Sequence, residues 1–280
     1  MRLLMTGSHG FVGTNLIEAL GDKHEIIRWD VRSDEPLPEV DTVIHLAGKA
    51  HDTKHTTEDA EYYAVNTDLT KKIYDQFLES SAKKFIFFSS IKAQDGDTPY
   101  AMSKIAAEDY ILSKNDSNKQ VYILRPCMIH GTGNKGNLNL LVIWVKIGFP
   151  WPLAAFENKR SFASIGNVAY IVSELLKKDV KSGIYNICDD EAVSTNELIG
   201  LICNCMEKKS LLWRIPKGMM KSLARVGDTL HLPLNSERLG KLTENYIVDN
   251  NDIKCALGIE SLPVSAVDGL RESIRSLIKE

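Results

Sequence analysis

Ser90, Tyr100 and Lys104 have side chains suited to proton transfer at an alcohol carbon. They lie in one segment, FIFFSSIKAQDGDTPYAMSK, whose apolar start predicts a strand buried on both faces that ends at serine hydroxyls. The composition and apolar spacing of residues 101–113 favour a helix, which would place Tyr100 and Lys104 one turn apart on one face. A phenol is a poor acid or base near neutral pH, but a cation held close favours its phenolate. These three groups are therefore suited to oxidising or reducing an alcohol carbon.

The same tyrosine and lysine also fit the exposed face of an ordinary helix, so the interpretation depends on the beginning of the chain. Residues 2–5 predict a strand and residues 14–20 a helix, with Gly7, Gly10 and Gly13 in the turn between them. Glycines in such a turn let the backbone approach a pyrophosphate, which the free amides and the dipole of the helix N-terminus then hold. The turn therefore predicts a dinucleotide-binding site.

An acidic residue follows the second predicted strand, residues 24–29. Asp30 is placed to accept hydrogen bonds from the adenosine ribose hydroxyls. A carboxylate there would repel a 2′-phosphate, so Asp30 favours NAD over NADP. Arg32, two residues later, could offset this repulsion, and NADP stays possible.

Length and composition describe an ordinary globular chain. Its 280 residues, 44% of them hydrophobic, are enough for one large domain or two closely joined ones. The net charge of −3 excludes a global basic field for nucleic acid, so an anionic substrate would need local cations. The five scattered cysteines lack the paired spacing of a zinc site and predict reduced thiols in the cytoplasm, with no metal. Residues 1–5 are too short an apolar run for a signal peptide or anchor.

The middle of the chain contains a long connection, residues 135–160, with two prolines and several aromatic residues. A connection of this length inside a compact domain predicts a binding loop or lid. Residues 138–156 are its most lipophilic part, but Lys146 and two prolines interrupt them, so no spanning helix is expected. An exposed apolar patch here, at a subunit or membrane surface, stays an open alternative.

The spacing Gly-x-x-Gly-x-x-Gly, together with Tyr100-x-x-x-Lys104, resembles the extended short-chain dehydrogenase/reductase family over nearly the whole chain. Within that family it is similar to the nucleotide-sugar epimerases, dehydratases and reductases. The resemblance implies an α/β fold, a Rossmann-type doubly wound parallel sheet with a smaller C-terminal α/β substrate-binding subdomain. The implied dinucleotide-binding domain comprises residues 1–130 and 164–183, and the nucleotide-sugar-binding subdomain residues 131–163 and 184–280.

The resemblance also implies which residues hold the cofactor. The segment after the third predicted strand resembles the family segment under the adenine and pyrophosphate, and Asn66 matches a family asparagine in the cofactor cleft. From the sequence alone, Asn66 would be interpreted as the cap of a helix that begins there. The implied cofactor-binding residues are Gly7, Gly10, Phe11, Val12, Gly13, Asp30, Leu46, Ala47, Gly48, Asn66, Ser89, Tyr100 and Lys104.

In the mechanism that the resemblance implies, Tyr100 moves the proton on the sugar oxygen while hydride passes between the sugar carbon and the nicotinamide. Ser90 would orient the same oxygen, and Lys104 would bind the nicotinamide ribose and favour ionisation of Tyr100. Arg160 and Arg238 are the cations expected at the substrate diphosphate, because a guanidinium offers paired donors to phosphate oxygens. The last strand and helix of the family are expected at residues 246–249 and 251–257.

Three reactions share this first step. Dehydratases of the family carry an Asp-Glu pair directly after the strand-end hydroxyl, where this chain has Ile91 and Lys92, so dehydration is not expected. Three features resemble bacterial reductases that act on the 4-keto group of UDP-linked N-acetylated 6-deoxy sugars for surface polysaccharide. They are the SSIKA segment, the short spacing along the chain from Ser90 to Tyr100, and the NKRSFASIGN segment. A UDP-sugar 4-epimerase with tightly bound NAD is the alternative, and a non-catalytic dinucleotide sensor is an alternative of another class.

Two further expectations concern partners and location. The resemblance implies a cytoplasmic homodimer, formed by the helices after Asn66 and Tyr100. A UDP-sugar is the expected substrate, and neither a nucleic acid nor a membrane span is expected.

Overall fold

The computed structural model describes residues 1–50, 58–94, 96–114, 116–134, 138–230 and 234–279. Contacts within the chain divide it into two compact units. Unit 1 comprises Met1–Cys127, Asn167–Ile187 and Asn250–Ser261, and unit 2 comprises Met128–Gly166, Cys188–Asp249 and Leu262–Glu280.

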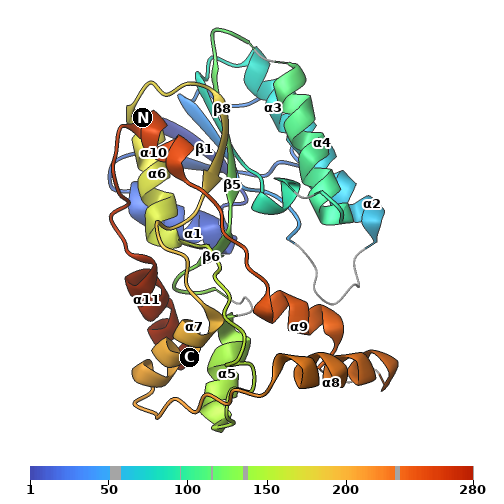
Figure 1. Ribbon diagram of the computed structural model, residues 1–280. Coiled ribbons are helices and arrows are strands. Elements are labelled where there is room, and N and C mark those ends of the chain that lie inside the picture. Colours follow the sequence, from blue (N-terminus) through green and yellow to red (C-terminus); the bar gives the residue numbers. More distant parts are fainter. Residues whose placement is uncertain (51–57, 95, 115, 135–137, 231–233, 280) are drawn as a thin grey trace. The chain divides into compact units, whose positions relative to one another are not determined.

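Six parallel strands form the central sheet of unit 1 (Figure 1). All residues of the two middle strands are buried, as expected for short apolar runs covered on both faces. In spatial order the strands are β2 (Glu25–Trp29), β1 (Arg2–Thr6), β3 (Thr42–His45), β4 (Lys84–Phe88), β5 (Gln120–Pro126) and β8 (Gly183–Ile187).

Helices cover both faces of this sheet, which makes it a doubly wound Rossmann-type sheet. In Figure 1, α3 and α4 lie on one face and α1 and α6 on the other. The aromatic rings of Tyr74 and Phe77 pack from α3 against Phe85 of β4, with both ring centroids 5.1 Å from that of Phe85. The helical segments are α1 (Phe11–Leu20), α2 (Asp59–Tyr62), the π-helical η1 (Tyr63–Asp68), α3 (Leu69–Glu79), the 3-10 segment η2 (Ile91–Gln94), α4 (Pro99–Ser113), α6 (Ile165–Lys177) and α10 (Asn251–Leu257).

The strand order reverses at β1. The chain passes from β1 to β2 on one side and then crosses to β3 on the other. The register pairs Thr6 with both Trp29 and His45, so the segments after these three strands diverge at the same edge of the sheet. In open parallel sheets, ligands bind at such a switch point, outside the carboxyl ends of the strands.

Unit 2 is mainly helical and has its own core. Strands β6 (Met128–His130) and β7 (Phe162–Ser164) pair in parallel. Buried side chains from the helices and from the segment around Trp151 form the core. No helix in the described part of the chain is long and apolar enough to cross a membrane. The helices are α5 (Leu138–Ile147), α7 (Thr195–Cys205), α8 (Lys217–Leu230), α9 (Ser236–Thr243) and α11 (Ala266–Lys279).

Three local expectations differ from the structure. The connection over 135–160 contains a helix, α5, because its apolar residues recur at helical spacing and bury Leu138, Val142 and Val145. Residues 135–137 of that connection lie outside the described part. Asn66 does not begin a helix, because α2, η1 and α3 follow one another without a break.

The third difference concerns the strand expected over 246–249. Only Tyr246 pairs with a neighbouring chain segment, through backbone hydrogen bonds to Lys159 and Ser161. Two residues further along the chain, the amide of Val248 points to the same neighbouring segment but donates to the Ser161 hydroxyl, at 3.1 Å. A side-chain oxygen therefore replaces the backbone carbonyl that a strand would pair with. The strand pairing ends after the single bridge at Tyr246.

Candidate functional site

The glycine turn after β1 is a close approach of two backbone segments. Gly7 has φ of +66°, and a Cβ placed there would lie 2.6 Å from the amide nitrogen of Ala47. A Cβ on Gly13 would lie 2.5 Å from the carbonyl oxygen of Gly7. Both positions therefore exclude any side chain. Gly10 is the N-cap of α1 and offers no side-chain cap, so among the described residues no side chain caps the first amides of this helix.

The expected residues around this turn lie where a dinucleotide could contact them. Phe11 and Val12 are partly buried in the first turn of α1. Asp30 is exposed directly after β2, and its carboxylate accepts from the Arg32 amide at 3.0 Å. These groups surround the carboxyl ends of β1 and β2, as the sequence predicts for a dinucleotide crevice.

A buried histidine connects β1, β3 and α3. His45 is fully buried, with Nδ1 2.7 Å from the Thr6 hydroxyl and Nε2 2.9 Å from the Thr70 hydroxyl. Burial, with a smaller contribution from the charge of Lys104, lowers the pKa of His45 to about 3, so its ring is neutral. Thr6 also accepts from the Ala47 amide at 3.2 Å. This network fixes the segment Leu46–Gly48 beside the glycine turn.

Asn66 occupies the π-helical segment η1 and is completely buried. Its side-chain oxygen accepts from the Lys49 amide at 2.7 Å, and its nitrogen donates to the Ser103 hydroxyl at 3.0 Å. A Cβ on Gly48 would lie 3.0 Å from the Asn66 oxygen and 3.2 Å from the Lys104 ammonium. Asn66, Gly48 and Lys104 thus meet at one point, and a π-helical turn at this position is typical of functional sites.

Lys104 is buried, and its ammonium donates to the Phe88 carbonyl at 2.9 Å, at the end of β4. It also lies 4.9 Å from the centre of the Phe87 ring. Burial lowers the pKa of Lys104 to about 8, while the carboxylate of Glu108 acts in the opposite direction. The ammonium is therefore charged at neutral pH but close to its titration range.

Tyr100, partly exposed near the start of α4, is hydrogen-bonded to the Ser90 hydroxyl. The helix begins with Thr98 as its N-cap, which accepts from the Ala101 amide at 3.2 Å, and with Pro99 in the first turn. Burial raises the pKa of Tyr100, the hydrogen bond from Ser90 lowers it, and the neighbouring Tyr62 raises it. The structure thus brings the phenol and the serine hydroxyl together.

An ion pair that the sequence analysis missed supports the end of β4. Glu108 is 2% exposed and accepts from the guanidinium of Arg125, with Nε 3.0 Å and 3.1 Å from its two oxygens. The Ser89 hydroxyl donates to the same carboxylate. Ser89, expected among the cofactor-binding residues, is thus held by Glu108. Glu108 lies one helical turn after Lys104 on α4. This Lys-x-x-x-Glu spacing is the one feature of the sequence that could have pointed to Glu108.

Arg160 and Arg238 belong to unit 2. Arg160 is partly buried, and its guanidinium donates to the Lys241 carbonyl in α9. Arg238 is exposed on the same helix, and its amide donates to the side chain of Asn235, the N-cap of that helix, at 2.8 Å. Arg160 therefore contacts the helix that carries Arg238.

The residues of unit 1 fit a dinucleotide and a proton donor at the carboxyl edge of one sheet. The glycine turn with Gly7 and Gly13, which we call the glycine cradle, the helix N-terminus without a side-chain cap and Asp30 suit an adenosine diphosphate. Tyr100 and Ser90 form a hydrogen-bonded pair at the end of β4, on the same edge. This arrangement suits proton transfer next to a hydride carrier.

Known proteins are similar to this chain in sequence and in fold. The UDP-glucose 4-epimerase of Vibrio cholerae is 28% identical, over 99% of this chain and 95% of that protein. The UDP-2-acetamido-2,6-beta-L-arabino-hexul-4-ose reductase of Pseudomonas aeruginosa is 30% identical over 51% of this chain and 39% of that protein. The solved structure of MoeE5 in complex with UDP-glucuronic acid and NAD has a TM-score of 0.76 at 19% identity, and covers 100% of this chain and 99% of that one. Residues 3–188 match the model of the NAD dependent epimerase/dehydratase family, and the chain belongs to that family.

Proposed function

We propose that the protein is an NAD(P)-dependent oxidoreductase that acts at C4 of a UDP-linked sugar. Its proposed reaction is reduction of the 4-keto group of a UDP-linked, N-acetylated 6-deoxy hexulose in surface polysaccharide synthesis. The observation that carries this proposal is the hydrogen bond between Ser90 and Tyr100 at the carboxyl end of β4. A phenol held by a hydroxyl beside a dinucleotide crevice is suited to protonating an alkoxide as it forms.

The residues of unit 1 have distinct roles in this proposal. The amides of Phe11 to Gly13 would bind the pyrophosphate, and Asp30 would accept hydrogen bonds from the adenosine ribose. Asn66, Gly48 and Lys104 lie together where the nicotinamide ribose would bind. When bound, the reduced dinucleotide supplies the hydride. Because Asp30 carries a negative charge where NADP would place a phosphate, NAD is the proposed cofactor.

Tyr100 and Ser90 act on the substrate oxygen. As the hydride adds to C4, the carbonyl oxygen gains negative charge, and Tyr100 donates its proton to that oxygen. Ser90 donates a hydrogen bond to the same oxygen and stabilises its charge. A proton from solvent then restores the phenol, and Lys104, beside Asn66 and Gly48, would hold the nicotinamide ribose.

The substrate diphosphate needs cations, and Arg160 and Arg238 are proposed for this role. Support comes from the contact of Arg160 with α9, where it donates to a carbonyl of the helix that carries Arg238. A guanidinium is well suited to paired hydrogen bonds with phosphate oxygens.

A UDP-sugar 4-epimerase with tightly held NAD is the second candidate. The Vibrio cholerae epimerase supports it, because that similarity extends over almost the whole chain. The reductase is supported by the resemblance of the SSIKA and NKRSFASIGN segments and by the Pseudomonas aeruginosa reductase. Both candidates use the same Tyr100 chemistry and differ in what happens to the cofactor after one hydride transfer.

Cofactor turnover separates the two candidates. The purified protein is mixed with a UDP-linked 4-keto-6-deoxy sugar and NADH or NADPH, and in parallel with UDP-hexoses without added cofactor. Consumption of one reduced cofactor for each sugar reduced supports the reductase. Retention of NAD through purification, with interconversion of UDP-hexoses in the absence of added cofactor, would replace it with the epimerase.

The proposal also includes a cytoplasmic homodimer formed through α3 and α4. These are the helices that follow Asn66 and Tyr100 in the chain. Light scattering on the purified protein tests the dimer. Charged substitutions at Leu112, exposed on α4, would convert it to a monomer if this helix forms the contact.

A further inference from the structure

Unit 2 exposes an unusual number of large apolar side chains. Most of the exposed large apolar residues in the described part of the chain lie in two segments of this unit, and we refer to them together as the apolar surface. It consists of Leu140, Ile143, Trp144, Ile147, Phe149, Leu211, Leu212, Trp213, Met219, Leu223, Val226 and Leu230. Exposed patches of this kind mark interaction sites in soluble proteins.

The first part of the apolar surface is continuous in space. The ring of Trp144 on α5 lies 6.1 Å from that of Phe149 and 6.3 Å from that of Trp151, measured between centroids. The Trp151 amide donates to the Leu211 carbonyl, and the Trp213 amide donates to the Trp151 carbonyl, each at 2.8 Å. The end of α5 and the segment 211–213 are therefore neighbours, although about 60 residues separate them in the sequence.

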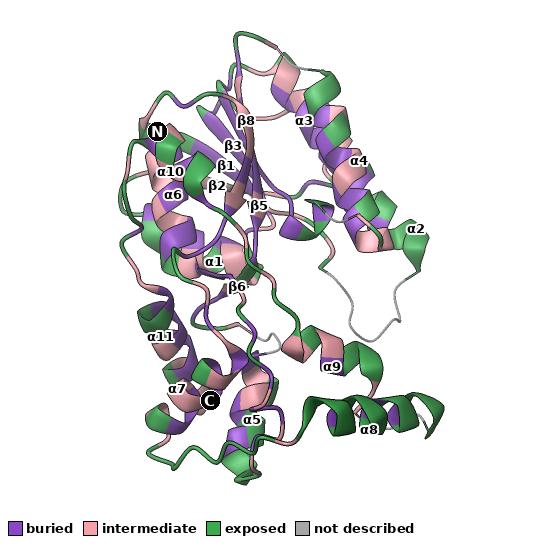
Figure 2. Cartoon of the chain, viewed as in Figure 1, coloured by how far each residue is buried: buried purple, intermediate pink, exposed green. Residues whose placement is uncertain are grey.

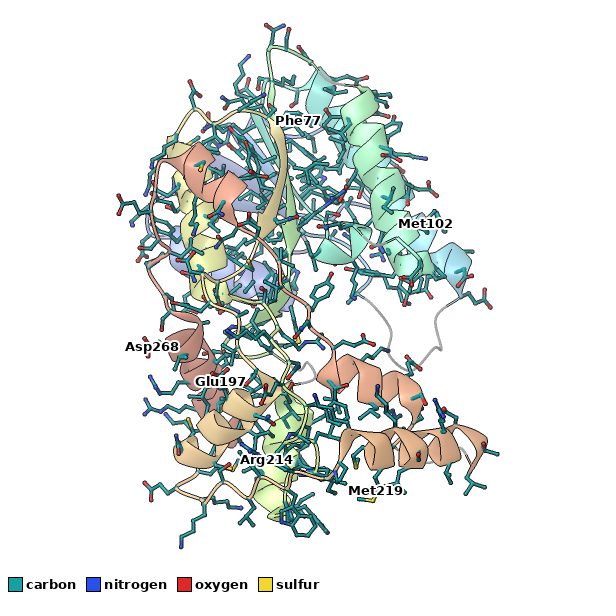
Figure 3. All side chains as sticks on the ribbon, viewed as in Figure 1. Phe77, Met102, Glu197, Arg214, Met219 and Asp268 are labelled. Carbon is teal, nitrogen blue, oxygen red and sulfur yellow. The ribbon has the colours of Figure 1, made fainter. Side chains whose placement is uncertain are left out.

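Helix α8 supplies the second part. Met220 and Ala224 are buried in the core of unit 2, whereas Met219, Leu223 and Leu230 are exposed with the spacing of a second helical stripe. In Figure 2 nearly all of α8 is coloured as exposed. Figure 3 labels Met219 on this helix and Arg214 in the segment that leads into it. A helix with an unpaired apolar stripe is typical of segments that bind in an interface.

The charge of the same region is strongly one-sided. Residues 208–226 contain six lysines and arginines and no acidic residue, although the chain as a whole has a net charge of −3. Three of these cations, Lys217, Lys221 and Arg225, recur along α8 at helical spacing. The exposed helix is thus amphipathic, with its apolar stripe on one side and its cations on the other, as in helices that lie in the interface of an anionic bilayer.

We propose that the apolar surface docks unit 2 on an anionic lipid bilayer. The side chains of Trp144, Phe149 and Trp213 would enter the boundary between headgroups and acyl chains, where amphipathic indole rings are favoured. The lysines and arginines of 208–226 would be attracted to the lipid phosphates. Docking of this kind is peripheral and needs no spanning helix.

The charge distribution favours a bilayer over a second copy of the chain. A two-fold symmetric contact places the same patch on both partners. It would bring two copies of segment 208–226, each with six cations, towards each other without acidic residues from that segment to compensate. An anionic membrane supplies the opposite charge.

Vesicle flotation of the full-length protein tests this proposal. We expect the protein to float with phosphatidylglycerol-rich vesicles at least about tenfold more strongly than with phosphatidylcholine vesicles, and to be released by salt. Brominated acyl chains should quench its tryptophan emission, since Trp144 and Trp213 are exposed on the docking surface. Phe149→Glu should reduce vesicle binding by at least about tenfold.

The matched control is Ile247→Glu. Ile247 and Phe149 are both 64% exposed, but Ile247 lies outside the apolar surface. It should keep vesicle binding within about twofold, and both variants should keep the melting temperature of the parent protein because neither site is buried. Absence of flotation, equal loss in both variants, or a solution dimer that Phe149→Glu dissociates would overturn the proposal. This test uses no substrate, so its outcome is independent of the proposed enzyme activity.

Discussion

The ammonium of Lys104 donates to the carbonyl of Phe88 at 2.9 Å, which places this cation against the end of β4. The sequence suggested that Lys104 would act on the phenol of Tyr100. In the structure, the groups that shift the pKa of Tyr100 are its buried surroundings, Ser90 and Tyr62. Ser90 is thus the group that holds the phenol, and Lys104 is positioned next to Asn66 and Gly48.

Removal of the Ser90 hydroxyl should impair proton transfer. Ser90→Ala is expected to reduce kcat by about 10²-fold, because the variant loses the one hydroxyl that bonds the phenol in the free protein and would donate to the substrate oxygen in the complex. The pKa of Tyr100 should rise, since the hydrogen bond from Ser90 lowers it. A pH series of kcat measures both effects. Ser113→Ala, which removes an exposed hydroxyl from the end of α4, should leave the pH profile unchanged.

Lys104 makes the stability of the protein without cofactor depend on pH. Its pKa in the folded state is about 8, below the value of 10.5 for a free lysine, so folding disfavours the ammonium. The cost of burying the ammonium is fully present below pH 8. Between pH 8 and 10.5 the unfolded chain binds more protons at Lys104 than the folded chain, so stability rises with pH over this range. The relief is on the order of 3 kcal/mol.

Urea unfolding of the wild type and of Lys104→Met at about pH 7 and above about pH 10 measures this effect. The unfolding free energy of the wild type should gain about 3 kcal/mol relative to the variant over this range. A constant difference between the two proteins would show that the ammonium carries no burial penalty. The variant should have no activity at either pH.

The pair of Glu108 and Arg125 should couple strongly in a double-mutant cycle. Glu108→Leu leaves the Arg125 guanidinium without its carboxylate partner and should destabilise the fold by about 3 kcal/mol. The double variant with Arg125→Leu should recover much of this loss, because no charge is then left without a partner. Additive losses in urea unfolding would show that the two side chains act independently.

The glycine cradle should not tolerate a methyl group. Gly13→Ala places a Cβ 2.5 Å from the Gly7 carbonyl oxygen, so the turn must move, and NAD affinity measured by calorimetry should fall by at least about tenfold. Gly200→Ala is the control, because nothing lies within 4 Å of a Cβ at that position in α7. It should stabilise the helix by about 0.5–1 kcal/mol and leave NAD affinity unchanged.

The sequence predicted the sheet and the glycine turn well for a physical reason. Buried parallel strands require short apolar runs, and a backbone that approaches within van der Waals distance requires glycine, as at Gly7 and Gly13. Both requirements are local and visible in a few residues. The pairing of Ser90 with Tyr100 also follows from local elements, a strand end and a helix start.

The features that the sequence could not provide depend on contacts between distant segments. Glu108 follows Lys104 by one turn and resembles an exposed helix residue until β5 brings Arg125 beside it. His45 is held in place by hydroxyls from two distant elements, Thr6 of β1 and Thr70 of α3. The single bridge at Tyr246 likewise depends on Ser161, whose hydroxyl replaces a strand partner.

The central claim is that Tyr100 protonates the sugar oxygen as hydride reaches C4, and isotope transfer tests it most directly. Wild type and Tyr100→Phe are incubated with NADH that carries deuterium at the transferable position and a UDP-linked 4-keto-6-deoxy sugar. The wild type should place deuterium on C4 of the product, and the variant should bind NADH normally but transfer at least about 10²-fold more slowly. Wild-type turnover by Tyr100→Phe would contradict the claim, and so would the absence of deuterium transfer by the wild type, which is what a non-catalytic dinucleotide sensor would show.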